Sequence, residues 1–396
     1  MAPSSSGTPL YVHVPFCVHK CPYCDFFSVE GAGQNQDAMV DTLLLEARQK
    51  GPRDPKTVFL GGGTPSYLAP ETLERLLVGL QEATNYQRSA VEVTVECNPE
   101  SLTPEKAALM VENGVNRLSI GIQSLHPATL AFFERPHGPE EALRAIETAQ
   151  AAGLSSFSVD LIHSAPQEDT ATFVGNLRQI LDLRPPHLSV YGLIYEPGTP
   201  LHERLERGEF TPQDEDAELN NLEAVQSALL CASYDQYEVS NFATIGHQCR
   251  HNINYWRNGE YVGLGPSAVS LVAGRRFGNA RSLGRWTQAV REQKSVPNWE
   301  ETLAPRARLG ETWWLGLRMM SGVDPARARA TAGWPEPATG QPDLTPADPT
   351  PDESDPCLAE AEQLVQEGLL ERAGQRYKLT PKGLPLADHV GRRFLA

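Results

Sequence analysis

Three cysteines near the start of the chain have the residue type and spacing needed to hold a metal centre. They are Cys17, Cys21 and Cys24, with three residues between the first pair and two between the second. Thiolates select zinc or an iron–sulfur cluster. Structural zinc sites and ordinary [4Fe–4S] centres take four protein ligands. A loop that offers three therefore leaves one metal position open, and a small molecule can bind there.

The spacing of these cysteines is also compatible with a zinc site or with a structural role. A distant histidine or cysteine could complete a zinc site, or the cysteines could belong to a core by coincidence. The aromatic residues around the loop favour a cluster, because they would exclude water from it and tune its potential. They are Phe16, Tyr23, Phe26 and Phe27.

The elements that must position the loop follow from the hydrophobic pattern of the first half of the chain. Apolar runs rich in β-branched residues predict six buried strands. They lie at 10–14, 57–60, 91–96, 116–122, 155–162 and 187–194. Amphipathic helical patterns separate them, at 38–49, 70–82, 104–113, 140–152 and 170–183. This alternation predicts an α/β fold, a partial (β/α)6 barrel with a parallel sheet, over roughly the first 200 residues.

The second half of the chain has a less regular pattern. Residues 240–275 are irregular and aromatic-rich, and helical periodicity returns at 307–320. The segment 335–356 contains seven prolines and six acidic residues, which predicts a disordered linker. A helix, a strand pair and a last helix after it predict a winged-helix-like unit, interpreted as a structural cap because it has no basic stripe. We expect domains at 1–235, 236–334 (a largely helical extension) and 357–396, with the linker at 335–356.

Composition limits the class of protein. The chain has 396 residues, of which 40% are hydrophobic and 21% charged, as in soluble globular proteins of two or three domains. A net charge of −16 argues against binding to nucleic acid or to an anionic membrane surface. The sequence contains no apolar run of about 18 residues and no secretory signal pattern. Seven mostly scattered cysteines argue against a disulfide framework, so we expect a reducing, cytoplasmic location.

Several residues lie where βα barrels gather functional groups, at the C-terminal ends of strands. Gly61-Gly62-Gly63-Thr64 follows the second predicted strand. Its glycines let the backbone approach a ligand and leave N–H groups for it, although a tight turn is the default explanation of this run taken alone. Glu96 ends the third strand and Gln123 the fourth. Asp160 lies within the fifth strand, where an acid is costly unless it is paired or bound.

Together these features resemble the radical S-adenosylmethionine (SAM) superfamily. The lead-in 11–17 narrows the resemblance to the HemN/HemW family, which contains oxygen-independent coproporphyrinogen III oxidases and haem chaperones. The resemblance implies a [4Fe–4S] cluster on Cys17, Cys21 and Cys24, with the amino and carboxylate groups of SAM on the open iron. It implies the barrel fold as well. The SAM-site residues that it implies are Tyr11, Gly62, Gly63, Thr64, Glu96, Gln123, Arg135 and Asp160.

The sequence departs from this family at two places. The run 160–166 replaces the usual Gly-Leu-Pro turn, which we expect to change loop geometry only. Val269 stands where relatives usually carry histidine, and Ser267 where they carry glycine. The resemblance therefore assigns no ligand or proton-transfer role to Val269.

Two functions occur within the family, radical decarboxylation of coproporphyrinogen III and transfer of haem by a chaperone. The oxidases that this chain resembles carry a fourth cysteine two residues after the third, where this chain has Phe26. They also carry a long N-terminal arm, whereas only ten residues precede Tyr11. We therefore expect a chaperone that binds haem and passes it to acceptor apoproteins, and we assign no catalytic residue.

A third feature is the HNxxYW motif at 251–256, which resembles the motif associated with haem binding in the chaperones. Neutral imidazole suits haem iron, the aromatic rings can stack on a porphyrin, and Arg250 can pair with a propionate. His251 is thus the candidate haem ligand, with Cys249 as a rival. The alternative is that the motif caps a loop and its aromatics fill the core. A homodimer and transient contact with membrane haemoproteins stay open.

Overall fold

The structure is a computed structural model that describes residues 7–86, 91–166, 168–294, 297–334 and 355–395. It divides into two compact units. Unit 1 contains Met1–Gln236, Ser240–His251 and Glu260–Glu301, and unit 2 contains Tyr237–Val239, Asn252–Gly259 and Thr302–Ala396. Both units thus take part of the segment 236–334. Most of the predicted linker, 335–354, lies outside the described residues.

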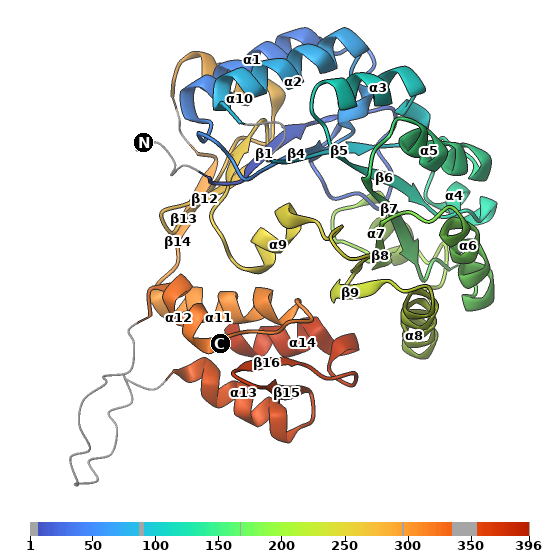
Figure 1. Cartoon of the computed structure of the whole chain (residues 1–396), viewed down its shortest axis with the longest axis vertical. Helices are drawn as coiled ribbons and strands as arrows, with labels where there is room; N and C mark the ends of the chain where they lie inside the picture. Colours follow the sequence, from blue (N-terminus) through green and yellow to red (C-terminus); the bar gives the residue numbers. More distant parts are fainter. Residues whose placement is uncertain (1–6, 87–90, 167, 295–296, 335–354, 396) are drawn as a thin grey trace. The chain divides into compact units, whose positions relative to one another are not determined.

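A curved nine-stranded sheet forms the centre of unit 1 (Figure 1). Its order is β11-β1-β4-β5-β6-β7-β8-β10-β9, parallel from β11 to β8, with β10 antiparallel to β8. The strands are β1 (Leu10–Val14), β4 (Thr57–Gly62), β5 (Glu92–Cys97), β6 (Arg117–Gln123), β7 (Ser156–His163), β8 (His187–Gly192), β9 (Asp235–Glu238), β10 (Asn241–Ala243) and β11 (Val262–Leu264). All six predicted strands are present, and they form the predicted parallel core.

Helices between these strands cover the convex face of the sheet (Figure 1). They are α1 (Gln36–Lys50), α2 (Pro70–Thr84), α3 (Pro104–Glu112), α5 (Pro139–Ala151) and α6 (Thr170–Asp182). Shorter or later helices of unit 1 are α4 (Pro127–Phe132), α7 (Pro200–Glu206), α8 (Glu215–Cys231) and α10 (Leu283–Arg291). The five predicted helices are confirmed, and each end lies within two residues of its predicted position. Across the described ranges, no helix is long and apolar enough to cross a membrane.

The sheet separates an apolar face from a polar one. On β1, Leu10, Val12 and Val14 are fully buried in the core shared with the helices. Because successive side chains of a strand point to opposite faces, Tyr11 and His13 lie on the other, concave side. The same face of β5 carries Glu92, Thr94 and Glu96. This polar concave face is where the candidate site lies.

Local signals explain how the helices begin and end. Thr103 caps α3, since its hydroxyl oxygen accepts a hydrogen bond of 3.3 Å from the backbone N–H of Lys106, and Pro104 takes the first helical position. The helix ends before Gly114, whose φ of 85° lies in the left-handed region that glycine adopts without strain. Both ends agree with the predicted start and stop.

The region 240–275 contains more structure than its irregular pattern predicts. It holds β10, α9 (Arg250–Trp256), β11, β12 (Val269–Val272) and β13 (Arg275–Gly278). The last two form a separate three-stranded sheet with β14 (Trp299–Thr302), in the order β12-β13-β14. These elements are three to seven residues long, too short for a periodic pattern. Pairing with distant strands stabilises them, as where Val262 of β11 lies beside Leu10 of β1.

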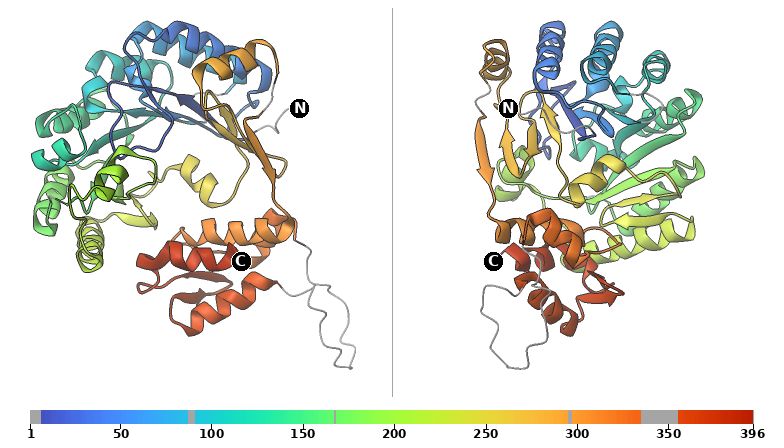
Figure 2. Two further views of the ribbon diagram at one scale, coloured as in Figure 1. Left: turned by 180° about the vertical axis from the view of Figure 1, so that it is seen from behind. Right: turned by 60° about the vertical axis from the view of Figure 1, so that its left-hand side comes forward.

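Unit 2 has its own small core. Its elements are α11 (Pro305–Leu317), α12 (Pro325–Ala332), α13 (Pro356–Gln366), β15 (Leu370–Ala373), β16 (Arg376–Leu379) and α14 (Ala387–Arg392). Figure 2 shows these orange-to-red helices gathered around the hairpin. Trp313 is fully buried and stacks on Phe394 with 5.1 Å between ring centroids. The predicted order of helix, strand pair and helix after residue 356 is confirmed.

Candidate functional site

The cysteine loop leaves the sheet at the C-terminal end of β1. Cys17 lies on β2 (Phe16–Cys17), which pairs with β3 (Val29–Glu30), so the loop between them is closed at its base. Inside the loop, the backbone N–H of Cys24 donates to the Cys21 carbonyl over 3.1 Å. The three cysteines therefore lie within one short connection at the edge of the barrel where functional residues gather.

Two of the three thiols, those of Cys17 and Cys24, lie in surroundings that disfavour their ionised form. Burial raises the pKa of Cys24 to about 11 and also raises the pKa of Cys17. Since a thiolate is the metal ligand, a bound cation must supply the charge that ionises them. Within the described part of the chain, no three His, Cys, Asp or Glu side chains are grouped closely enough to hold a metal ion. The cluster assignment of Cys17, Cys21 and Cys24 thus stays a prediction from their chemistry.

A chain of polar contacts links the first two cysteines. Arg135 directs Nη1 to the Cys21 sulfur at 3.3 Å and Nη2 to Asn98 Oδ1 at 2.8 Å. Asn98 donates from Nδ2 to the Thr64 hydroxyl at 2.9 Å, and that hydroxyl lies 3.6 Å from the Cys17 sulfur. The structure thus brings the predicted Thr64 and Arg135 to the cysteine loop. Their chemistry fits a thiolate-bound cluster, because a guanidinium and a hydroxyl beside the sulfurs stabilise negative charge.

Asn98 was missed in the sequence, although a signal for it exists. It follows β5 directly, two residues beyond Glu96, at the edge where functional residues gather. Only the fold shows that its side chain lies between Arg135 and Thr64.

The glycine turn at the end of β4 packs tightly. A Cβ atom on Gly61 would lie 2.6 Å from Glu96 Oε2, and one on Gly62 would lie 2.3 Å from His13 Nδ1. Gly62 also has a φ of 103°. These positions therefore admit no side chain without a shift of the neighbouring groups.

The expectation that this turn leaves backbone N–H groups for a ligand is wrong. Gly62 donates to Glu96 Oε2 at 3.0 Å, Gly63 to the Val14 carbonyl at 2.9 Å, and Thr64 to the Phe16 carbonyl at 2.7 Å. The N–H groups bind β1, β2 and Glu96 because the turn sits directly against all three. Close approach of the backbone, rather than unpaired donors, is what these glycines provide.

Two acids lie on the concave face of the sheet. Burial, together with the charge of Asp160, raises the pKa of Glu96 to about 7, against the hydrogen bond from Gly62. Asp160 accepts hydrogen bonds of 2.7 Å from the hydroxyls of both Ser119 and Ser158. Burial raises its pKa as well. The expected cost of an acid within β7 is thus offset by hydroxyl partners.

Gln123 lies at the end of β6 in a strained conformation. Its φ is 63°, in the left-handed region that non-glycine residues rarely adopt, and the pairing with β7 is irregular between Gly121 and Gln123. Arg135 Nη2 also donates to the Gly121 carbonyl at 2.8 Å. Strain of this kind concentrates at functional sites, where the surrounding structure maintains it.

Tyr11 and His13 connect β1 to the cysteine loop. Burial lowers the pKa of His13 to about 4, so the ring is neutral near pH 7. Its Nε2 lies 2.7 Å from the Phe27 carbonyl, which can only accept, so Nε2 carries the proton. Nδ1 then accepts a hydrogen bond of 3.0 Å from the Tyr11 hydroxyl. His13, which sequence reasoning passed over, thus links the predicted Tyr11 to the loop.

The start of the HNxxYW motif is buried against the sheet. Glu92 on β5 accepts hydrogen bonds from the backbone N–H groups of Arg250 (3.1 Å) and His251 (3.0 Å). The His251 ring is 1% exposed, its Nδ1 lies 2.7 Å from the Thr57 hydroxyl, and it stacks on Phe59. Burial lowers its pKa to about 3. This geometry is the one expected if the motif caps a loop and its aromatic residues fill the core.

The remaining candidates of this region are placed similarly. Cys249 is 3% exposed, and its sulfur lies 3.8 Å from Glu92. The Arg250 side chain is 57% exposed and pairs with Glu92 at 3.7 Å. Neither Cys249 nor His251 is therefore presented at the surface. Their roles toward haem stay predictions.

The two departures from the family pattern fall on turns. Ser164 has a φ of 66°, and its hydroxyl binds both His163 Nδ1 (2.7 Å) and Asn221 (3.0 Å), which stabilises the altered turn. Ser267 has a φ of 65°, a conformation that glycine adopts more easily. Val269 begins β12.

Comparison with known proteins assigns the fold to a class. Residues 11–179 match the family model of the Radical SAM superfamily. The coproporphyrinogen III oxidase HemN from Escherichia coli has a similar structure, with a TM-score of 0.79, 21% identity and coverage of 99% of this chain and 90% of that one. The chain therefore has the fold of a radical SAM protein.

Sequence relatives narrow this class. The heme chaperone HemW of Lactococcus lactis is 32% identical over 97% of this chain and 96% of its own length. HemW of Escherichia coli is 38% identical over 76% of this chain and 82% of its own. HemW of Mycobacterium tuberculosis is 33% identical over 98% and 94%. The chain belongs to the HemW family of radical SAM proteins.

Proposed function

We propose that this protein binds haem and passes it to acceptor proteins, and that it carries a SAM-bound [4Fe–4S] cluster. The observation that carries the proposal is the side chain at position 26. The oxidases resembled here have a fourth cysteine there, whereas Phe26 is 68% exposed and cannot bind a metal. The three sequence relatives above are named heme chaperones, which supports the same function.

The proposed cluster ligands are Cys17, Cys21 and Cys24. When bound, the cluster supplies a redox-active iron with one position open to SAM. Arg135 would balance the charge of the thiolates from its position beside Cys21, and Thr64 would donate to Cys17. The buried Nε of Arg135 has no hydrogen-bond partner in the described residues, which supports a further acceptor in this place.

The concave face of the barrel suits a cationic ligand with hydroxyl groups. Glu96 and Asp160 provide two carboxyls whose pKa values are raised, so a positive sulfonium beside them would favour their ionised form. We propose that Glu96 accepts hydrogen bonds from the ribose hydroxyls of SAM. Tyr11, Gly62, Gly63, Gln123 and Asp160 complete the proposed site.

Haem is the cargo in this proposal. For His251 to bind its iron, the imidazole must leave Thr57 and Phe59 and reach the surface. Haem ligation there would thus be coupled to movement of α9. Burial lowers the pKa of His251 and so keeps its imidazole neutral, which is the form that binds iron.

The test is anaerobic. The chain with a reconstituted cluster receives reductant, SAM and coproporphyrinogen III, and tetrapyrroles and 5′-deoxyadenosine are measured by mass spectrometry. Haem is then titrated by its Soret absorbance, and transfer to apomyoglobin is followed. We expect no decarboxylation, saturable haem binding and haem transfer. Formation of protoporphyrinogen would overturn the proposal in favour of an oxidase.

A further inference from the structure

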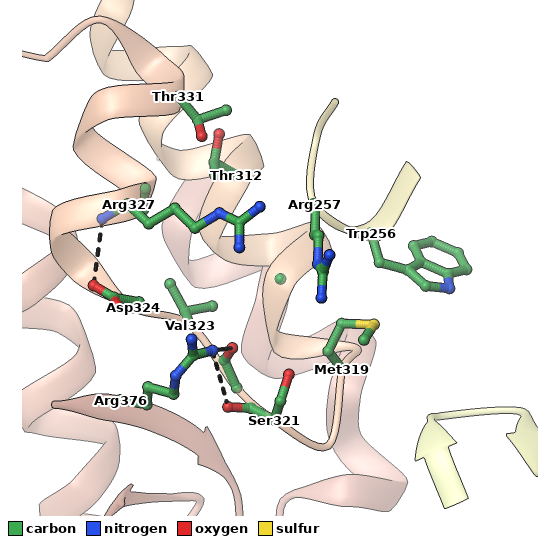
Figure 3. Close-up of a pocket in the computed structure, with 13 residues that line it drawn as sticks. Trp256, Arg257, Thr312, Met319, Ser321, Val323, Asp324, Arg327, Thr331 and Arg376 are labelled. Carbon is green, nitrogen blue, oxygen red and sulfur yellow. Dashed lines mark hydrogen bonds between the residues drawn. The ribbon is translucent and has the colours of Figure 1, made fainter. Parts of the chain in front are cut away.

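Three arginines of unit 2 surround one small pocket. Arg257 follows α9, Arg327 lies on α12 and Arg376 on β16. Figure 3 shows the three guanidinium groups entering the pocket from different elements. Its volume is about 70 Å³. Trp256, the last residue of the HNxxYW motif, and Met319 also line the pocket, and in Figure 3 the indole points away from the guanidinium groups.

These arginines have no acidic partner in the described residues. The acid in the pocket wall, Asp324, accepts hydrogen bonds from the backbone N–H groups of Ala326 (3.1 Å) and Arg327 (3.3 Å). Several other arginines of unit 2 are paired, as Arg329 is with Asp355 at 3.1 Å and Arg318 with Asp388 at 2.9 Å. Three arginines against one acid leave an excess of positive charge at this pocket, in a chain whose net charge is −16.

Like charges at this pocket repel one another until an anion arrives. Partial burial, followed by the charges of Arg327 and Arg376, lowers the pKa of Arg257. Two long hydrogen bonds hold the Arg376 side chain in place, since its Nη1 donates to the Ser321 and Gly322 carbonyls over 3.5 and 3.4 Å. Guanidinium groups bind carboxylates and phosphates through paired N–H donors, so an anionic oxygen group would relieve the repulsion.

We infer that this pocket binds a propionate carboxylate of haem. The inference rests on the proposed function, and it assigns one propionate of the haem cargo to this pocket. A cavity needs about 10–15 Å³ of such volume to hold one water, so this pocket has room for a carboxylate or an inorganic phosphate rather than for a whole porphyrin. Because Trp256 and Met319 lie beside this pocket, an apolar ring attached to the carboxylate has apolar side chains to contact, which inorganic phosphate does not use. The ring itself lies outside the pocket.

The experiment compares haem, haem dimethyl ester and inorganic phosphate on the full chain. The ester keeps the iron and ring but lacks free carboxylates, and both are titrated in the same mild detergent. We expect haem to bind the wild type about tenfold more tightly than the ester, as one charge-assisted contact implies. Arg327→Gln should remove that difference by weakening haem and leaving the ester unchanged.

Two further variants keep the result interpretable. Arg372→Gln removes the same charge from an exposed arginine that pairs with Glu362 outside the pocket, and it should keep the full preference for haem. Arg376→Lys keeps the charge and loses the planar fork, and it should give an intermediate preference. Thermal unfolding of each variant checks that the fold is retained.

The outcomes separate the inference from the proposed function. Equal binding of haem and ester to the wild type, or an unchanged preference in Arg327→Gln, would overturn the inference while the chaperone function stands. Competition by phosphate in the wild type without any effect of the variants on haem would assign the pocket to phosphate and overturn it too. A wild type that binds neither haem nor ester would overturn the proposed function itself.

Discussion

Asn98 accepts a hydrogen bond of 2.8 Å from Arg135, and this contact joins the ends of two strand–helix units beside the cysteine loop. Asn98 follows β5, whereas Arg135 follows α4. The same guanidinium lies 3.3 Å from the Cys21 sulfur. Asn98 is therefore a positioning residue, since it directs Arg135 toward a proposed cluster ligand.

Replacing Asn98 should loosen the cluster without removing a ligand. Asn98→Ala loses the contacts with both Arg135 and Thr64, each worth about 1 kcal/mol or more. We expect faster loss of iron and sulfide to a chelator under anaerobic conditions. Asn98→Asp keeps an acceptor for Arg135 and loses the donor to Thr64, so its rate should fall in between. Loss of iron at the wild-type rate in both variants would contradict the positioning role.

Replacing any of Cys17, Cys21 or Cys24 by serine should abolish cluster assembly, because each removes a thiolate from the proposed three-ligand set. Iron and sulfide content and the EPR spectrum of the reduced protein measure this. Cys231→Ser is the matched control, since Cys231 is exposed on α8. A full cluster in one of the first three variants would remove that cysteine from the set.

The buried carboxyl of Glu96 should make stability depend on pH. Its pKa rises from 4.5 to about 7 in the folded chain, so the ionised form is disfavoured by folding. Relative to Glu96→Gln, the free energy of unfolding of the wild type should fall between pH 4.5 and 7 and level off above that. The loss should not exceed about 3 kcal/mol.

Melting curves of both proteins across this range, in the same cluster state and without SAM, measure the effect. A wild type and a Glu96→Gln variant with parallel pH profiles would show that this carboxyl is not perturbed. Saturating SAM should reduce the difference, because a cation beside Glu96 favours its ionised form.

A pair of variants separates the two roles considered for His251. His251→Ala should weaken haem binding whether the imidazole ligates iron or only packs. Thr57→Val leaves the imidazole in place and removes its 2.7 Å partner. If His251 is the ligand, Thr57→Val should keep haem binding or strengthen it, since the ring leaves its partner more easily.

Stability is the second measurement on this pair. His251 is buried and stacks on Phe59, so we expect His251→Ala to destabilise unit 1 by about 2 kcal/mol or more. Equal loss of haem binding in both variants, in proportion to their loss of stability, would assign the motif a packing role.

Much of the fold is readable from local patterns in the chain. The six strands and five helices of the barrel follow from apolar periodicity, and Thr103 and Gly114 mark the ends of α3. The cysteine loop and the residues at strand ends are likewise visible, since each is a short motif or follows directly from a strand.

The remaining features depend on contacts between distant residues. The roles of Asn98, His13 and Glu92 arise because the order and register of the strands bring side chains far apart in sequence within hydrogen-bond distance. For the same reason, the backbone N–H groups of the glycine turn already donate to neighbouring groups of the chain. The arginines at 257, 327 and 376 carry no common motif, and only the packing of unit 2 brings them to one pocket. Sequence alone thus determined the strands and helices of the barrel and predicted the chemistry of the cysteine loop. The tertiary structure decided which charged and polar side chains meet, because electrostatic interactions and hydrogen bonds act through space.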